Sequence, residues 1–172
     1  GVHYVDAPVS GGTKGAEEAS LAIMAGGAAE EFATVTAALS AMGRPVHVGP
    51  VGAGQLAKLA NQAIVGITIA AVAEAMLMLQ NGGADPAAVR AALKGGFADS
   101  TILQLHGARM TTGDFTPGGL CTLQLKDLNN AVSEAESFGL ILPTLINTRD
   151  RFQRLVTKLD GAELDHSALY LE

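Results

Sequence analysis

The segment from Asp6 to Gly12 (Asp-Ala-Pro-Val-Ser-Gly-Gly) joins a hydroxyl group to two glycines at the end of a strand-like run. Ser10 offers an O–H donor, and Gly11 and Gly12 can adopt positive φ angles that leave their backbone N–H groups uncovered. A row of amides beside a hydroxyl is a nest that suits a carboxylate or a phosphate. The same residues also suit an ordinary strand-to-loop turn, so both interpretations stay open at this point.

A second set of polar side chains is spaced three and four residues apart, which places them on one face of a helix: Gln55, Lys58, Asn61 and Gln62. The helix beyond them is almost entirely apolar. A partly buried lysine beside amides can act as a proton donor or as an anchor for an anion, because desolvation and neighbouring groups tune its pKa. The alternative is the solvated end of a long helix.

A third polar cluster begins at Lys126 and Asp127. These two residues are adjacent in a predicted helix, so we expect them to point in different directions, and they need not pair with each other. A solvated helix face explains the cluster equally well.

One glycine pattern has a tempting but weak meaning. Gly52-Ala53-Gly54 follows a predicted strand and opens a helix, as a dinucleotide-binding loop does. Such a loop also needs a second strand within a unit of about 30 residues, and here the helix continues past Glu74. We therefore do not expect this segment to be a nucleotide loop.

The elements that must position these residues change in character along the chain. The first fifty residues predict strands over 2–9, 21–25 and 45–48, with a glycine loop after the first strand and a helix over 30–42. Beyond Gly54 the pattern is helical throughout. Helices are expected over 53–80, 86–95, 100–110 (capped by Asp99 or Ser100), 123–138 and 143–158, with a final turn at 165–168. The fold class is α+β and mainly α: a small strand-containing piece, one long helix and an all-helical bundle.

Composition limits the function further. The chain has 172 residues, 48% of them hydrophobic, and a net charge of −6, which excludes a nucleic-acid partner because no basic stripe is present. Its single cysteine, Cys121, indicates a reducing compartment, and we expect a cytoplasmic protein. Its four histidines are scattered, so we predict no metal site. The apolar stretch 63–79 contains Gly66, Thr68 and Glu74, which favours a helix buried between protein surfaces over one in a membrane.

Three of these motifs together resemble one family, the β-hydroxyacid dehydrogenases, which include 3-hydroxyisobutyrate dehydrogenases and tartronate semialdehyde (2-hydroxy-3-oxopropionate) reductases. They are the segment 6–12, the pattern Gly52-x-Gly54-x-x-x-Lys58-x-x-Asn61, and Lys126-Asp127-Leu128. The resemblance covers essentially the whole chain. Gly95-Gly96-Phe97-Ala98 and the residues from Leu103 to Met110 lean toward the reductase branch.

The resemblance implies a role for each motif. Ser10, Gly11 and Gly12 would hold the carboxylate of a small substrate, and Asn61 would orient it. Lys58 would be the catalytic lysine that protonates the alkoxide as hydride arrives. Lys126, with Asp127, would approach the nicotinamide of NAD or NADP. The resemblance also implies homo-oligomers packed through helices, and a 6-phosphogluconate-dehydrogenase-like helical domain over 51–172 that follows the last strands of a Rossmann domain over 1–50.

The sequence differs from the family pattern at two positions and lacks one of the family's parts, and several expectations follow from these differences. Relatives often carry asparagine where this chain has Gln62, and phenylalanine where it has Gly119. The family's amino-terminal Rossmann half, with its pyrophosphate loop, is not in this sequence, so we expect a carboxy-terminal piece that does not turn over alone. Its unpaired sheet edge would be covered by dimerisation or helix exchange. The alternatives are a non-catalytic oligomerisation module, 3-hydroxyisobutyrate as the substrate and, less well supported because no arginine cluster is present, a phosphogluconate-like sugar.

Overall fold

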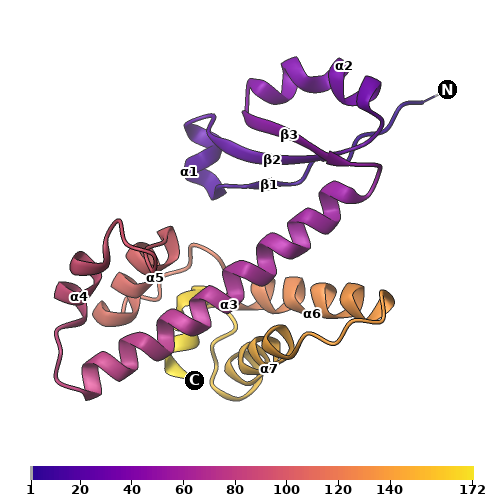
Figure 1. Ribbon diagram of the computed structural model, residues 1–172. Helices are drawn as coiled ribbons and strands as arrows, with labels where there is room; N and C mark the ends of the chain where they lie inside the picture. The colour runs from indigo at the N-terminus through magenta and orange to yellow at the C-terminus, as the bar shows by residue number, and fades with distance from the viewer. Residues whose placement is uncertain (1) are drawn as a thin grey trace. The chain divides into compact units, whose positions relative to one another are not determined.

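The computed structural model describes residues 2–172, which form two compact units, divided between Asn61 and Gln62. We describe each unit by itself. The elements of the first unit are β1 (Val9–Ser10), α1 (Gly12–Glu17), β2 (Leu21–Gly26), α2 (Ala29–Ser40), β3 (Gly43–Gly49) and the first turns of α3 (Ala53–Asn81) (Figure 1). The remaining elements belong to the second unit. The predicted mainly helical α+β fold is confirmed.

The sheet of the first unit has the strand order β1-β2-β3, with β1 antiparallel and β3 parallel to β2. The strand expected over 2–9 is much shorter than predicted. An isolated bridge joins Asp6 to Gly26, Pro8 accepts a hydrogen bond from Met24 N, and continuous pairing starts only at Val9. Because Pro8 has no N–H to donate, the ladder is interrupted there.

The segment expected to be a glycine loop contains the short helix α1. Gly11 precedes it with φ 139°, a backbone conformation that side chains rarely adopt. Gly15 presses against β2, since an added Cβ would lie 3.1 Å from Leu21 Cδ2. Close packing of a glycine-rich turn on β2 therefore replaces the open loop.

The predictions for β2, α2 and β3 are confirmed to within a few residues. In β2 the side chains of Leu21, Ile23 and Ala25 are buried, as the alternation along a strand requires. On the other flank, the rings of Phe32 in α2 and His47 in β3 stack with centroids 5.2 Å apart. α2 thus packs on the sheet through its half-buried apolar face.

The long helix α3 (Ala53–Asn81) is confirmed with nearly the expected ends. By length and composition it is the one described helix apolar enough to cross a membrane, and core helices of other proteins pass the same test. In the second unit its stripe Ile69, Val72, Ala73 and Met76 is buried, at the spacing of one helix face. This stripe indicates that α3 packs as a core helix there.

The second unit is entirely helical. After α3 it contains α4 (Pro86–Leu93), α5 (Thr101–Thr112), α6 (Cys121–Ser137), α7 (Pro143–Lys158) and the 3₁₀ helix η1 (His166–Leu171). Asp85 caps α4 and Ser100 caps α5, as side-chain acceptors of backbone N–H groups. α6 starts two residues earlier than expected, because Cys121 N bonds Leu164 O and Leu120 pairs with Asp165 in an isolated bridge. These contacts lie more than forty residues apart in sequence, so no local pattern reports them.

Candidate functional site

A buried carboxylate anchors the segment 6–12 to the start of α3. Asp6 is 4% exposed; its Oδ1 accepts a hydrogen bond from Gly52 N at 2.7 Å and its Oδ2 accepts one from Gln55 N at 2.8 Å. Burial by itself would raise the pKa of Asp6, but the bonds from Gly52 and Gln55 outweigh it and hold that pKa below its usual value. The ionised group therefore caps the start of α3, the helix that carries Lys58 three residues after Gln55.

The glycines of the Gly52-x-Gly54 pattern serve this junction. A Cβ added at Gly54 would lie 2.6 Å from Asp6 Oδ2, and closer still to the carbonyl oxygen of Met24. Gly52 has φ 92° and can turn the chain into the helix. The positive φ explains Gly52, and the close approach of Asp6 and Met24 explains Gly54.

The predicted carboxylate-binding residues lie at the end of β1 and the start of α1. Ser10 pairs with Ala22 of β2, and Gly11 and Gly12 form the turn into α1. Nothing lies within 4 Å of a Cβ built on Gly12, so the space beside it is open. Lys58 and Asn61 are half-buried on α3 in the same compact unit. Asp6, missed as a functional residue in the sequence, ties the two sets to each other.

The second unit holds Lys126 and Asp127. Their side chains pair, although adjacent helix positions do not require it, with Lys126 Nζ 3.0 Å from Asp127 Oδ1. The long lysine chain folds back toward its neighbour, which the directions of the two Cβ atoms on a helix do not preclude. Gln62 of α3 donates from Nε2 to Asp127 Oδ2 at 2.7 Å. One carboxylate thus binds a partner on each oxygen.

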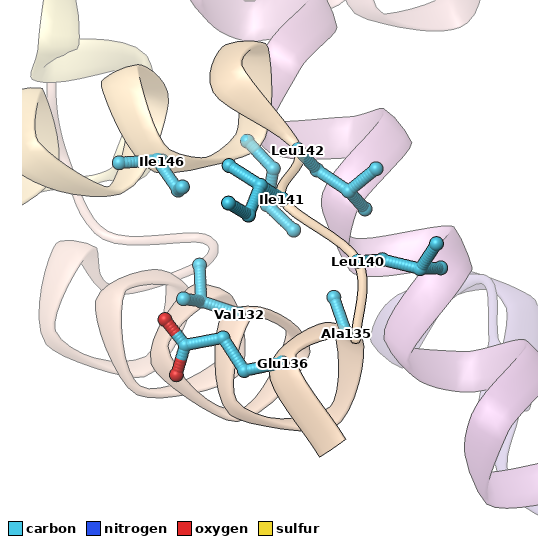
Figure 2. Close-up of a pocket in the computed structure, with 8 residues that line it drawn as sticks. Val132, Ala135, Glu136, Leu140, Ile141, Leu142 and Ile146 are labelled. Carbon is cyan, nitrogen blue, oxygen red and sulfur yellow. The ribbon is translucent and has the colours of Figure 1, made fainter. Parts of the chain in front are cut away.

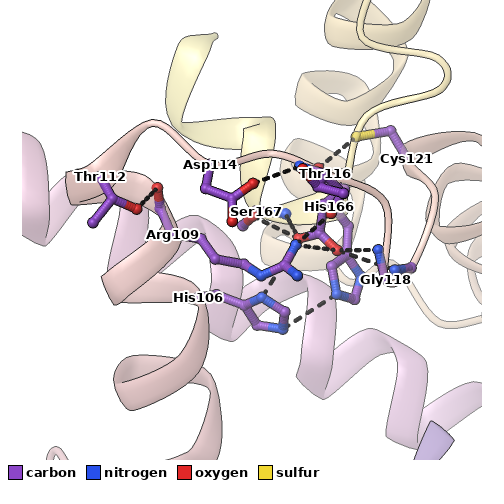
Figure 3. Close-up of polar contacts among 11 residues, drawn as sticks. His106, Arg109, Thr112, Asp114, Thr116, Gly118, Cys121, His166 and Ser167 are labelled. Atoms are coloured by element: carbon purple, nitrogen blue, oxygen red, sulfur yellow. Dashed lines mark hydrogen bonds and ion pairs between the residues drawn. The ribbon is translucent and has the colours of Figure 1, made fainter. Parts of the chain in front are cut away.

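A polar cluster that the sequence analysis missed joins α5, the loop before α6 and η1 (Figure 3). Asp165 is 1% exposed, and its Oδ2 accepts from Gly118 N and Gly119 N, both at 3.0 Å, and lies 3.1 Å from Arg109 Nη1. Its Oδ1 accepts from the N–H and the hydroxyl of Ser167. The predicted cap of the last turn was correct, but the buried ion pair was not foreseen.

Two of the scattered histidines meet in this cluster. His106 Nε2 and His166 Nε2 are 3.2 Å apart, and the rings cross edge to face. His106 Nδ1 has no hydrogen-bond partner among the described residues and lies 3.6 Å from Asp165 Oδ1. A proton on that Nδ1 would face the carboxylate, which leaves His106 Nε2 to accept from His166 Nε2–H. Burial first, and then the electrostatic interaction with His106, lower the pKa of His166 to about 4.

The ligand-type atoms of His106, Asp165 and His166 lie within 4.8 Å of one another, which is close enough for a metal ion. The donor set argues otherwise. Both Asp165 oxygens already accept hydrogen bonds, and the guanidinium of Arg109 would repel a cation. The cluster also accounts for Gly119, because a Cβ there would lie 3.2 Å from the His166 ring. We interpret it as a structural lock between η1 and the loop before α6.

Two further features do not suit the chemistry of a small anion. A cavity of about 270 Å³ between α6 and α7 is lined by aliphatic side chains and by the carboxylate of Glu136 (Figure 2). It offers an anionic substrate no positive charge. Cys121 is fully buried, and burial raises the pKa of its thiol to about 12, so it is no nucleophile.

Comparison with known proteins identifies the family. Residues 52–171 match the model described as the NAD-binding domain of NADP-dependent 3-hydroxyisobutyrate dehydrogenase, and residues 1–52 match the NAD-binding domain of 6-phosphogluconate dehydrogenase. The chain is 45% identical to 2-hydroxy-3-oxopropionate reductase of Escherichia coli over 98% of its length and 58% of that protein. It is 34% identical to a probable 3-hydroxyisobutyrate dehydrogenase-like protein of Arabidopsis thaliana, covering 97% of this chain and 50% of the relative.

Solved structures agree with this assignment. The 3-hydroxyisobutyrate dehydrogenase of Mycobacterium tuberculosis, solved with L-serine, matches with a TM-score of 0.86 and 29% identity over 97% of this chain and 60% of that one. The enzyme of the same name from Salmonella typhimurium matches with a TM-score of 0.89 and 25% identity over 98% of this chain and 60% of that one. The chain spans about half the length of the curated relatives it matches. The resemblance drawn from three short motifs is confirmed, and the chain belongs to the 3-hydroxyisobutyrate dehydrogenase family.

Proposed function

We propose that the protein containing this chain is an NAD(P)-dependent oxidoreductase that interconverts a small 3-hydroxy acid and the corresponding 3-oxo acid. The observation that carries the proposal is the junction made by Asp6. Its carboxylate bonds the backbone of Gly52 and Gln55. It thereby ties the Ser10–Gly12 segment to the helix start that presents Lys58, and both belong to one compact unit.

Lys58 is the proposed general acid in the direction of reduction. The ammonium group would donate a proton to the substrate oxygen as negative charge develops there, and in oxidation the neutral amine would take that proton back. Ser10 and the amides of Gly11 and Gly12 would bind the substrate carboxylate, and Asn61 would orient the reacting end. Half-burial of Lys58 supports this role, since a partly desolvated ammonium interacts more strongly with an anion than an exposed one does.

NAD or NADP supplies or accepts the hydride when it is bound. In this chain Lys126 and Asp127 are the residues proposed to contact it. The Lys126 side chain is 62% exposed while its ammonium is held by Asp127, which fits a cation presented to an anionic dinucleotide. The Gly52-x-Gly54 segment does not fit the pyrophosphate, because Asp6 and Met24 fill the space beside Gly54.

Tartronate semialdehyde is the proposed substrate, because the Escherichia coli relative named for it is 45% identical, whereas the relative named for 3-hydroxyisobutyrate is 34% identical. 3-Hydroxyisobutyrate is the alternative substrate.

We also propose a homo-oligomer in the cytoplasm. A non-catalytic oligomerisation module is the second candidate function; the exposed apolar side chains of α3, Ile64 and Met78, favour it.

Lys58→Ala in the full product of the gene separates these functions. With tartronate semialdehyde and NADPH or NADH, we expect kcat/KM to fall by about 10³-fold or more, since a positioned general acid contributes on the order of 10²–10⁴. Lys158→Ala, at the exposed end of α7, is the matched control and should leave kcat/KM unchanged. If the Lys58→Ala enzyme is as active as its parent, the catalytic proposal is rejected and the non-catalytic oligomerisation module remains as the candidate function.

A further inference from the structure

The carboxylate of Asp127 is held between two helices by two different partners. Gln62 of α3 donates from Nε2 to Oδ2 at 2.7 Å, and Lys126 of α6 places Nζ 3.0 Å from Oδ1. Asp127 is mostly buried, with a side-chain exposure of 21%, whereas Lys126 is 62% exposed. The amide of Gln62 therefore hydrogen-bonds to the mostly buried Asp127, which in turn pairs with the exposed Lys126.

The close packing of α6 on α3 fixes the position of Gln62 along α3 relative to Asp127 on α6. One turn beyond Gln62, a Cβ added at Gly66 would lie 2.9 Å from Gln124 Nε2 and 3.0 Å from Leu128 Cδ2. Gln124 is 2% exposed and donates from Nε2 to Gln62 O at 3.0 Å. The backbone and the side chain of Gln62 are thus both bonded to α6, so its amide has little freedom to slide along the helix.

Side-chain length matters at this contact. An asparagine at the same backbone position would withdraw the amide by about 1.5 Å, one carbon–carbon bond, and the hydrogen bond to Asp127 would be lost. A glutamate would have the right length but would set a second carboxylate against Asp127. Glutamine alone among these three residues combines the length with a donor.

We propose that Gln62 is a positioning residue for the cofactor contact: it orients Asp127 so that Lys126 is presented in one arrangement. The inference rests on the proposed function, in which Lys126 and Asp127 meet the nicotinamide cofactor. An ammonium on a four-carbon stem loses much rotational freedom when it binds an anion. When Asp127 is fixed, Lys126 has already lost part of this freedom before the cofactor binds. Less entropy is then lost on binding, so the affinity for the cofactor is higher.

The test measures NADPH binding and steady-state kinetics on the full gene product with Gln62→Leu, Gln62→Asn and Gln62→Glu. Loss of a hydrogen bond to a charged group corresponds to roughly a 10-fold or larger change in an equilibrium constant. We expect Kd and KM for NADPH to rise by about that factor, while kcat changes less than about 3-fold. Gln80→Glu is the matched control, on the same helix at an exposed position whose side chain accepts a hydrogen bond from Tyr170. It should change none of these constants.

A rescue experiment separates positioning from simple packing. Adding Asp127→Asn to Gln62→Glu restores a hydrogen bond with donor and acceptor exchanged, and it should recover part of the NADPH affinity lost in Gln62→Glu alone. If Gln62→Leu does not fold, as judged by circular dichroism, this pair of variants carries the test. Unchanged NADPH constants in all Gln62 variants of an enzyme that Lys58→Ala inactivates would overturn the inference. An inactive parent would instead overturn the proposed function, so the two failures are distinguishable.

Discussion

Asp6 is the residue on which the proposed active site depends most. Its two oxygens take two backbone N–H groups at the start of α3, and it is 4% exposed. Asp6→Asn keeps the size but turns an NH₂ group toward one of those N–H donors, which leaves that backbone N–H without an acceptor. We expect the free energy of unfolding to fall by about 1–3 kcal/mol in urea titrations at neutral pH.

The control for this prediction is a second aspartate at a helix start. Asp85 accepts from Ala87 N at 2.8 Å on an exposed surface, where asparagine caps a helix about as well as aspartate. Asp85→Asn should change the stability by less than about 0.5 kcal/mol. Because hydrogen bonds hold the pKa of Asp6 below its usual value, its contribution is complete above the pKa of the unfolded chain. The Asp6→Asn difference should therefore shrink as the pH falls below about 4.

For single residues, the sequence indicated which residue types matter better than it indicated their hydrogen-bond and ion-pair partners. The segment 6–12 stood out because serine and glycine have distinctive backbone and hydrogen-bonding properties. The partners of Asp6 lie 46 and 49 positions away, and nothing local to residue 6 specifies them. Helix geometry separates the Cβ directions of Lys126 and Asp127, but it does not fix the end of a long side chain, so it left their pairing open.

Among the elements, η1 is held by the cluster of His166 with His106, and we expect its stability to depend on pH. His166 lies against His106; burial first, then electrostatic interactions with His106 and Arg109, outweigh the effect of Asp165 and lower the pKa of His166 to about 4. In the unfolded chain the same imidazole takes up its proton near pH 6.5. Between these values the unfolded state binds more protons, so stability should fall as the pH is lowered from about 6.5 to 4, by roughly 2–3 kcal/mol. Asp165, whose pKa is lowered, contributes mainly below this window, where the carboxylates of the unfolded chain take up their protons.

Tyrosine fluorescence offers a direct measurement. The chain has two tyrosines and no tryptophan, so in a Tyr4→Phe background Tyr170 of η1 reports alone. Urea titrations from pH 7 to pH 4 should show the loss of stability, and His166→Gln should remove most of its pH dependence. His3→Gln, at an exposed histidine in the other unit, serves as the control. A pH dependence that survives His166→Gln would refute the role of the lock.

The ends of most helices could be predicted because their signals are local. Asp85 before Pro86 starts α4, Ser100 caps α5, and Pro143 opens α7. β1 and α1 could not, because a proline gap in the ladder and the contact of Gly15 with Leu21 are properties of the folded sheet. The histidine lock was beyond prediction for a similar reason. Its members are 60 residues apart, and only the packing of η1 on α5 brings them together.

Over the whole molecule, the family match and the proposed site meet at one junction. The family models meet at residue 52, where Gly52 bonds Asp6. The acidic chain carries its proposed anion contacts on a few placed groups, Lys58 and Lys126 among them. Its net charge of −6 does not oppose binding of a carboxylate, because local donors dominate at contact distance and salt screens the distant charges.

Large exposed apolar side chains predict self-association. Ile64 and Met78 on α3 are 66% and 70% exposed, and Ile141 between α6 and α7 is 79% exposed. Burial of each in an interface contributes on the order of 1.5–3 kcal/mol, enough in combination to favour a dimer at micromolar concentration. Light scattering at that concentration should give a mass above that of one chain. Ile64→Glu with Ile141→Glu should shift it toward the monomer, while Gln153→Glu, at an exposed polar position of α7, should not. A parent protein that stays monomeric would contradict the proposed homo-oligomer and, with it, the oligomerisation module, but not the chemistry of Lys58.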